Sequence, residues 1–332
     1  MNSNCARLRI CRAPGTVTYG WILLALMAVA PCALKAQMSW SATVGAETND
    51  EAEQANAFLP NELWVHERDS ITWTFGPVNE IHTVTFLTPG QVRPSFTAGC
   101  PGTTPSGSSF NGTTCVNSGA LSNKATYSVT FPTAGNYKLV CLVHADMNGV
   151  VHVLPMSDTL PHDQAFYNQQ GLDEARDLLN DVDNPFEEVA DFPARENAVL
   201  MIGELVATAG GRQYLSIVRF LPWTIRIRAG QTVEWMNTDP TEPHTVTFGT
   251  TSVAPANVTT ANDGALQGTV TSTTSVVSSG VLQAAPQDRV GLGQSPPGKT
   301  RVRITFPQPG TYNYICAIHA GLGMKGTVIV RP

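Results

Sequence analysis

The chain contains two copies of one long segment, and this duplication constrains its fold more than any other feature. Residues 58–86 align with residues 220–248 at a constant offset of 162 positions, and both segments open with Phe-Leu-Pro and end with His-Thr-Val-Thr-Phe. Residues 127–149 then align with residues 302–326, where the second copy has two more residues between a histidine and a methionine. A repeat of this length indicates a duplicated domain rather than a solenoid unit.

The composition of both copies favours β-structure. The chain of 332 residues is long enough for two domains, and it is 42% hydrophobic and 14% charged. Short runs of Val, Ile, Thr and aromatic residues are broken by Gly and Pro, which predicts an all-β sandwich or barrel. We place the first domain at 38–155, an acidic connector at 156–197 and the second domain at 198–332.

The first 36 residues have the pattern of a secretory signal peptide. Arg7, Arg9 and Arg12 precede the apolar run WILLALMAVAP, and small residues follow. This run is shorter than the roughly 20 apolar residues of a membrane-spanning helix. We therefore expect cleavage after Ala36, a periplasmic or secreted location, and no stable membrane span in the mature chain. An uncleaved anchor is the alternative.

Four of the seven cysteines lie outside the predicted signal peptide. Cys100 and Cys115 share one Gly/Ser/Thr-rich insertion, and in an oxidising compartment they can pair as a disulfide. Cys141 and Cys316 occupy equivalent positions in the two copies. They could in principle bridge each other, but the metal-binding residue types around each of them argue against this.

The connector 156–197 has a net charge of −9 and one helical pattern. Thr159 or Asp163 could cap the start of the helix. A helix packed on one domain as a spacer is favoured over an acidic surface that docks a partner. The acidity of the chain gives no support for a nucleic-acid partner. The apolar stripe predicted for this helix consists of Leu172, Ala175, Leu179 and Val182.

Each copy carries two imidazoles, one thiol and one thioether in the same order. Soft sulfur ligands combined with imidazole select copper, and two His, one Cys and an axial Met form the ligand set of a type 1, or blue, copper site. A structural zinc site would have more Cys or His and no Met. The sequence therefore predicts two copper ions per chain. The predicted ligands are His82, Cys141, His144 and Met147 in the first copy, and His244, Cys316, His319 and Met324 in the second.

Both copies resemble the cupredoxins, the plastocyanin and amicyanin family of small blue copper proteins. CAIHAGLGMKG is similar to the plastocyanin ligand loop, and CLVHADMNG is similar to the shorter amicyanin loop. EPHTVTF resembles the Pro-His segment of the family, whereas the first copy has Ile81 in place of the proline. The resemblance implies two Greek-key β-sandwiches and one-electron transfer, with His144 and His319 exposed as the route for electrons.

The other candidate residues are interpreted as structural. Asp146, inside the first ligand loop, could tune the copper potential, but a solvated side chain is favoured. The two Gly/Ser/Thr-rich insertions are interpreted as surface loops. The remaining histidines are expected at the surface, and three further methionines in the core or at its edge: His66, His152, His162, Met156, Met201 and Met236.

Three functions compete on this basis. The favoured one is an electron-transfer protein, not an enzyme, whose partner is a redox protein such as a c-type cytochrome or a membrane oxidoreductase. A two-domain copper oxidase or nitrite reductase would place His beside the type 1 Cys and in His-x-His pairs, and neither pattern occurs. A copper carrier would show Met-rich or His-rich tracts, which are also absent.

Overall fold

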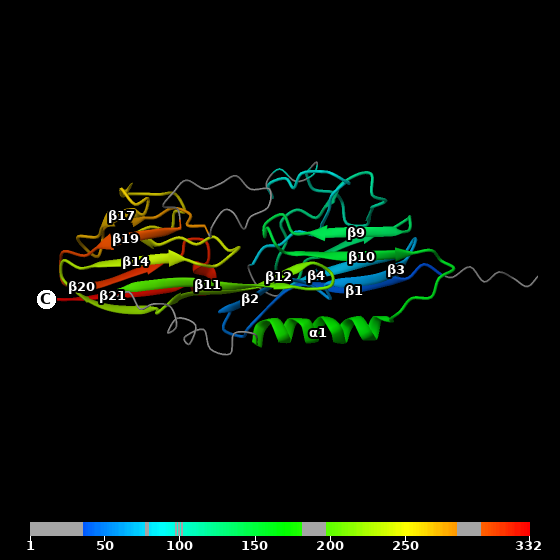
Figure 1. Ribbon diagram of the computed structural model, residues 1–332, viewed down its shortest axis with the longest axis horizontal. Helices are drawn as coiled ribbons and strands as arrows, with labels where there is room; N and C mark the ends of the chain where they lie inside the picture. The colour runs from blue at the N-terminus through cyan, green and yellow to red at the C-terminus, as the bar shows by residue number, and fades with distance from the viewer. Residues whose placement is uncertain are drawn as a thin grey trace, which may run out of the picture. The chain divides into compact units, whose positions relative to one another are not determined.

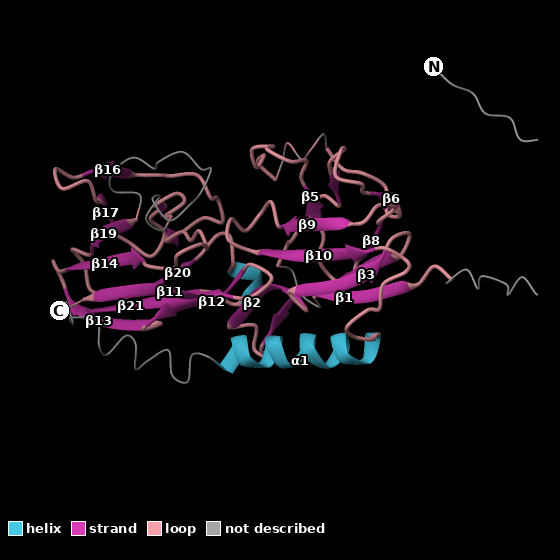
Figure 2. Cartoon of the chain, turned by 45° about the vertical axis from the view of Figure 1, so that its right-hand side comes forward, coloured by secondary structure: helices cyan, strands magenta, loops and turns pink. Residues whose placement is uncertain are grey.

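The computed structural model describes residues 36–332 except 77–79, 97, 99, 101, 181–196 and 284–299. The predicted signal peptide, apart from Ala36, lies outside the described residues, as do Val182 and most of the connector that follows it. No helix in the described part of the chain is long and apolar enough to cross a membrane. Strands are the main regular structure of the described residues, as the sequence predicts (Figures 1 and 2).

The first repeat forms two sheets. Their strand orders are β2-β1-β4-β8-β6 and β3-β10-β9-β5-β7. Strands β1 and β4 run parallel, as do β3 and β10 and also β6 and β8, while the other pairs in these two sheets are antiparallel. The strands are β1 (Ser39–Glu47), β2 (Glu53–Leu59), β3 (Glu62–His66), β4 (Ser70–Phe75), β5 (Thr85–Phe86), β6 (Ser108–Ser109), β7 (Val116–Asn117), β8 (Thr126–Thr130), β9 (Gly135–Val140) and β10 (Asn148–Leu154).

The second repeat has the same arrangement. Its strand orders are β12-β11-β14-β19-β17-β16 and β13-β21-β20-β15-β18. The parallel pairs β11-β14 and β13-β21 correspond to those of the first repeat. The strands are β11 (Ala198–Ala207), β12 (Arg212–Leu221), β13 (Thr224–Arg228), β14 (Thr232–Asn237), β15 (Thr247–Phe248), β16 (Val258–Thr260), β17 (Leu266–Thr269), β18 (Val277–Ser278), β19 (Arg301–Thr305), β20 (Gly310–Ile315) and β21 (Lys325–Arg331).

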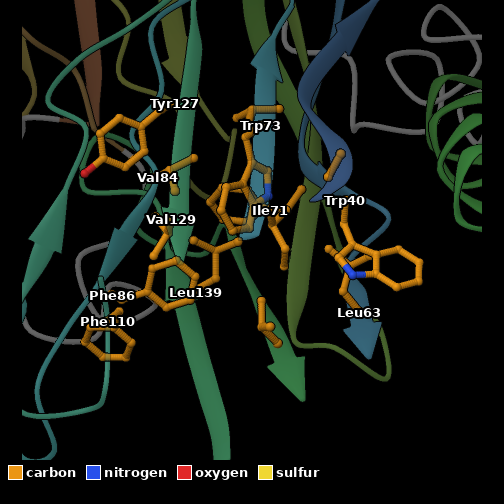
Figure 3. Packing of buried hydrophobic residues seen from close by; sticks show 14 of the residues in the cluster. Trp40, Leu63, Ile71, Trp73, Val84, Phe86, Phe110, Tyr127, Val129 and Leu139 are labelled. Carbon is orange, nitrogen blue, oxygen red and sulfur yellow. The ribbon is translucent and has the colours of Figure 1, made fainter. Parts of the chain in front are cut away.

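Each repeat has its own hydrophobic core between its two sheets. In β4 every second residue is buried, so that one face of the strand points inward, and β14 shows the same alternation. Trp73 and Trp235, which align in the two copies, are both fully buried in separate clusters. Figure 3 shows the first cluster, where the rings of Trp73 and Phe86 lie 5.8 Å apart between centroids.

The two repeats are joined by direct strand pairing. Strands β2 and β12 are antiparallel, with a register from Tyr214 opposite Asn56 to Ile217 opposite Glu53. Arg212, at the start of β12, also pairs with Asn148 at the start of β10, the strand that follows the first ligand loop. The second repeat therefore packs beside the ligand loop of the first, which determines the surroundings of both candidate sites.

The connector helix α1 (Gln164–Asn180) packs on β1 and β2 of the first repeat (Figure 2). The Asp163 carboxylate accepts a hydrogen bond from the backbone N–H of Phe166 at 2.9 Å, so Asp163 is the N-cap. The predicted stripe is wrong at Leu172, which is 66% exposed. The buried face is formed by Tyr167, Gly171 and Leu178, because Gly171 lets the helix approach the backbone at Leu59 closely.

Candidate metal centres

The first candidate centre lies at one end of the first sandwich. His82 is held by a backbone bridge to Leu121, and Cys141 and His144 lie on the loop between β9 and β10. The Nδ1 atoms of His82 and His144 are 2.9 Å apart, and the Cys141 Sγ lies 3.7 Å from the His144 Nδ1. All three residues are buried, and their ligand atoms lie within 4.8 Å of one another.

The second centre repeats this geometry. His244 is bridged to Leu282, and Cys316 and His319 lie on the loop between β20 and β21. The two Nδ1 atoms are 3.2 Å apart, and the Cys316 Sγ lies 3.5 Å from the Nδ1 of His319 and 3.9 Å from that of His244. The structure therefore brings together the His, Cys and His of both sets predicted from the sequence.

The predicted methionine ligands close the two loops. In the first loop, Cys141 N–H donates to the Met147 carbonyl at 3.0 Å, and Met147 N–H donates to the His144 carbonyl at 3.3 Å. In the second loop, Cys316 N–H donates to the Met324 carbonyl at 3.1 Å, and Met324 N–H donates to the His319 carbonyl at 3.2 Å. Both methionines are fully buried. The longer second loop forms a 3₁₀ turn over Ala320–Leu322, so its two additional residues leave the loop closure unchanged.

A threonine after the first histidine supports the cysteine in each repeat. Thr83 N–H lies 3.3 Å from the Cys141 sulfur, and the Thr83 hydroxyl accepts a hydrogen bond from Leu142 N–H at 2.7 Å. Thr245 makes the same two contacts in the second repeat, at 3.3 and 2.7 Å. A backbone N–H directed at sulfur favours the thiolate. Sequence reasoning did not assign this role, although the shared His-Thr-Val-Thr-Phe motif carried the signal.

The buried thiols and imidazoles shift one another's titration. Burial alone raises the pKa of Cys141 and Cys316, but the charges and hydrogen bonds of the neighbouring histidines outweigh it and hold both pKa values well below the ordinary range. Burial lowers the pKa of His144 and His319, but the neighbouring thiolates and the Glu242 carboxylate outweigh it and raise both pKa values well above the usual one. Each site thus favours a thiolate, the form that binds metal.

This donor set fits copper. Two imidazole nitrogens and one thiolate converge in a buried space, and a buried methionine closes the same loop. That combination of soft sulfur and imidazole is the one that selects copper among the common metals. His82, Cys141 and His144 would hold the ion in the first repeat, and His244, Cys316 and His319 in the second.

The expectation that the loop histidines are exposed is wrong. His144 is 1% exposed and His319 is 2% exposed. The cause is the packing of the repeats through β2 and β12, which places the ring of Tyr214, on β12, 5.8 Å from that of His144. Neither ring therefore presents an edge to solvent.

Two glutamates that sequence analysis did not assign lie beside these histidines. Glu80 and Glu242 align in the two copies, each two residues before the first histidine. The Glu80 Oε1 lies 3.2 Å from the His144 Nε2. The Glu242 Oε1 lies 3.1 Å from the His319 Nε2, and its Oε2 lies 3.5 Å from the His144 Nε2. Glu242 thus contacts the loop histidines of both repeats.

Three further expectations were tested by the structure. Asp146 is buried rather than solvated, because its carboxylate pairs with Arg212 of the second repeat at 3.2 Å. His66 is buried rather than at the surface, and its Nε2 lies 2.9 Å from the Asp158 carbonyl oxygen. Met201 is fully buried in the second core, as expected.

The cysteines divide into two groups. Cys100 and Cys115 are joined in a disulfide inside the first insertion. Cys141 and Cys316 are both buried free thiols. They do not bridge each other, since each faces the two histidines of its own repeat.

Comparison with known proteins assigns the second repeat to a family. Residues 209–331 match the model of copper binding proteins of the plastocyanin/azurin family. The matched segment lies within the second repeat, so this repeat is similar to the copper-binding domains of that family.

Several solved structures are similar to parts of the chain. Amicyanin from Paracoccus versutus is 22% identical, with 43% of this chain and 87% of that chain covered and a TM-score of 0.21. A purple cupredoxin from Nitrosopumilus maritimus is also 22% identical, with 40% and 98% covered and a TM-score of 0.20. A mutant fern plastocyanin is 20% identical, with 40% and 99% covered and a TM-score of 0.21.

Proposed function

We propose that this protein is a one-electron carrier that binds one type 1 copper ion in each repeat. The observation that carries the proposal is the duplication of a complete donor set. Two imidazole Nδ1 atoms and one thiolate converge in each repeat, and all of them are buried. When bound there, copper supplies a Cu(II)/Cu(I) couple.

The role of the protein is to hold the ligands still. Each first histidine is fixed by a backbone bridge, and each loop is closed by hydrogen bonds between its cysteine, histidine and methionine. A ligand set fixed by the rigid ends of two sheets does not rearrange when the oxidation state changes. Burial also excludes water from the sites, which keeps the reorganisation that accompanies electron transfer small.

The proposed carrier is not an enzyme. A nitrite reductase or oxidase would need a further catalytic copper. Within the described residues, the third group able to hold a metal is Glu80, Glu242 and His319. His319 already directs its Nδ1 at the second candidate centre. In the proposed function, these carboxylates therefore pair with the loop histidines rather than bind a catalytic ion.

The proposal includes export and a redox partner. The predicted signal peptide supports a periplasmic or secreted protein, and the disulfide between Cys100 and Cys115 is consistent with an oxidising compartment. The proposed partner is a redox protein such as a c-type cytochrome or a membrane oxidoreductase. Electrostatic attraction between the acidic chain and a cationic partner would speed their encounter.

A matched pair of substitutions tests this function. Cys141→Ser and Cys316→Ser each remove one thiolate and leave the other repeat unchanged. We expect each variant, loaded with Cu(II), to keep one type 1 centre and lose the intense visible absorption of the other. If either variant retains the spectrum of the parent, the assignment of that centre is wrong. Conversion of nitrite or reduction of oxygen by the parent would favour the enzyme instead.

A further inference from the structure

The carboxylate of Glu242 lies between the loop histidines of the two candidate centres. Its Oε1 is 3.1 Å from the Nε2 of His319, in its own repeat, and its Oε2 is 3.5 Å from the Nε2 of His144, in the other repeat. Both histidines direct their Nδ1 atoms at their own centre. A histidine that binds metal through Nδ1 keeps its proton on Nε2, so both rings present an N–H to the same carboxylate.

Glu242 is held in this position by several groups. The Tyr214 hydroxyl donates to its Oε2 at 3.0 Å. Its backbone N–H donates to Asp239 at 2.7 Å, and its carbonyl accepts from the Asn237 side chain at 2.9 Å. The residue is only 3% exposed.

We propose that Glu242 links the two centres, so that a single electron passes between the repeats through His144, Glu242 and His319. This inference rests on the proposed function. One electron leaves the reduced centre, which changes from Cu(I) to Cu(II), and enters the oxidised centre, which changes from Cu(II) to Cu(I). The Nε2 protons stay on the histidines and Glu242 stays ionised. No further reactant is needed.

The chain of contacts is suited to this task. Electrons tunnel more readily along covalent bonds and short contacts than across empty space. This path consists of two imidazole rings, one carboxylate, its 3.1 Å hydrogen bond with His319 and its 3.5 Å contact with His144. Because both histidines are almost completely buried, the path is shielded from water. The burial of His144 and His319 excludes the predicted route through solvent-exposed rings. The same burial places both rings beside Glu242, inside the protein.

Glu80 offers a matched control. It aligns with Glu242 and its Oε1 lies 3.2 Å from the His144 Nε2. Among the ion pairs of the described residues, Glu80 pairs with His144, whereas its carboxylate lies within 4.8 Å of a His319 ring nitrogen without pairing with it. Shortening Glu80 therefore changes the surroundings of the same histidines without removing the contacts that Glu242 makes with both.

The first test uses Glu242→Asp and Glu80→Asp, which keep the charge and remove one methylene each. In the Cu(I)-loaded protein, which is diamagnetic, NMR can observe the Nε2–H signals of both loop histidines. In the parent, we expect both protons to be protected from exchange with solvent. Glu242→Asp should lose this protection at one or both rings, because a shorter side chain cannot reach both. Glu80→Asp should change the His144 signal more than the His319 signal, because the ion pair of Glu80 is with His144. Unaltered signals in Glu242→Asp would overturn the link.

The second test measures electron transfer within the chain. Fully oxidised protein receives less than one electron per chain from a fast pulse of reductant, and the two blue absorption bands are followed as the electron redistributes. The Cys→Ser variants supply the reference spectrum of each centre. Redistribution should be slower in Glu242→Asp than in Glu80→Asp. Equal rates in all three proteins would overturn the proposal.

The number of metal ions bound per chain distinguishes failure of this inference from failure of the proposed function. Two copper ions per chain in the parent and in both Asp variants support the comparison. Fewer than two in the parent would refute the proposed function and the link together. A third metal ion per chain would refute the link alone, because the Nε2 atoms would then be ligands rather than hydrogen-bond donors.

Discussion

The hydroxyl of Tyr214 provides a direct test of how the junction between the repeats is stabilised. Tyr214 is fully buried on β12, and its hydroxyl donates to the Glu242 carboxylate at 3.0 Å. Burial and the nearby Glu242 charge raise its pKa well above the ordinary value, so the hydroxyl remains a donor. The substitution Tyr214→Phe removes this one donor and keeps the ring that packs against His144.

The loss in free energy of unfolding depends on the charge of the Glu242 carboxylate, which accepts this hydrogen bond. A hydrogen bond to a charged group contributes about 1.5–3 kcal/mol, because its loss leaves a buried charge with fewer partners. The change removes one oxygen atom and no carbon, so the loss of packing is small. We therefore expect Tyr214→Phe to lower the free energy of unfolding of the copper-free protein by about 1.5–3 kcal/mol.

Tyr127→Phe is the matched control. The Tyr127 hydroxyl pairs with the neutral Thr104 hydroxyl at 2.6 Å, and a neutral hydrogen bond contributes only about 0.5–1.5 kcal/mol. Urea denaturation of the mature, copper-free parent and of both variants measures the difference. The reasoning is refuted if Tyr214→Phe costs no more than Tyr127→Phe.

Two further predictions concern Gly45 in the first repeat and Glu174 on the connector helix. Gly45 has a φ of 75°, and a Cβ there would lie 2.7 Å from the His82 Nε2, so Gly45→Ala should alter the spectrum of the first copper centre alone. Gly90→Ala, at the same φ of 75° but in open space, should leave both spectra intact, and an equal effect of the two would contradict this. Burial of Glu174 raises the pKa of its carboxyl group in the folded protein. The protonated carboxyl group therefore contributes to the free energy of unfolding at low pH, and this contribution is lost as the pH rises through the raised pKa. Glu174→Gln should remove this part of the pH profile of the free energy of unfolding, and an unchanged profile would argue against it.

The ligand sets could be predicted because their signal is local. Cys141 and His144 are three residues apart on one loop, and Cys316 and His319 repeat that spacing. A loop that joins two strands holds such residues together whatever surrounds the sheet. The alternating burial of β4 is also a local property, since it depends only on the two-residue period of a strand.

The surroundings of the sites could not be predicted in this way. The burial of His144 depends on β12 pairing with β2 of the other repeat, and no pattern within either copy specifies that contact. The buried face of α1 depended on Gly171, whose missing side chain allows close approach to the backbone at Leu59. For Glu242 the signal was present, because it aligns with Glu80, but its role required a partner from the other repeat.

The central claim is that each repeat holds one type 1 copper ion. The most direct measurement is the copper content of the mature protein loaded with Cu(II), determined together with its EPR spectrum. The account predicts two copper ions per chain, both with the narrow hyperfine splitting of type 1 centres. One copper ion per chain, or a second ion with an ordinary type 2 spectrum, would contradict it.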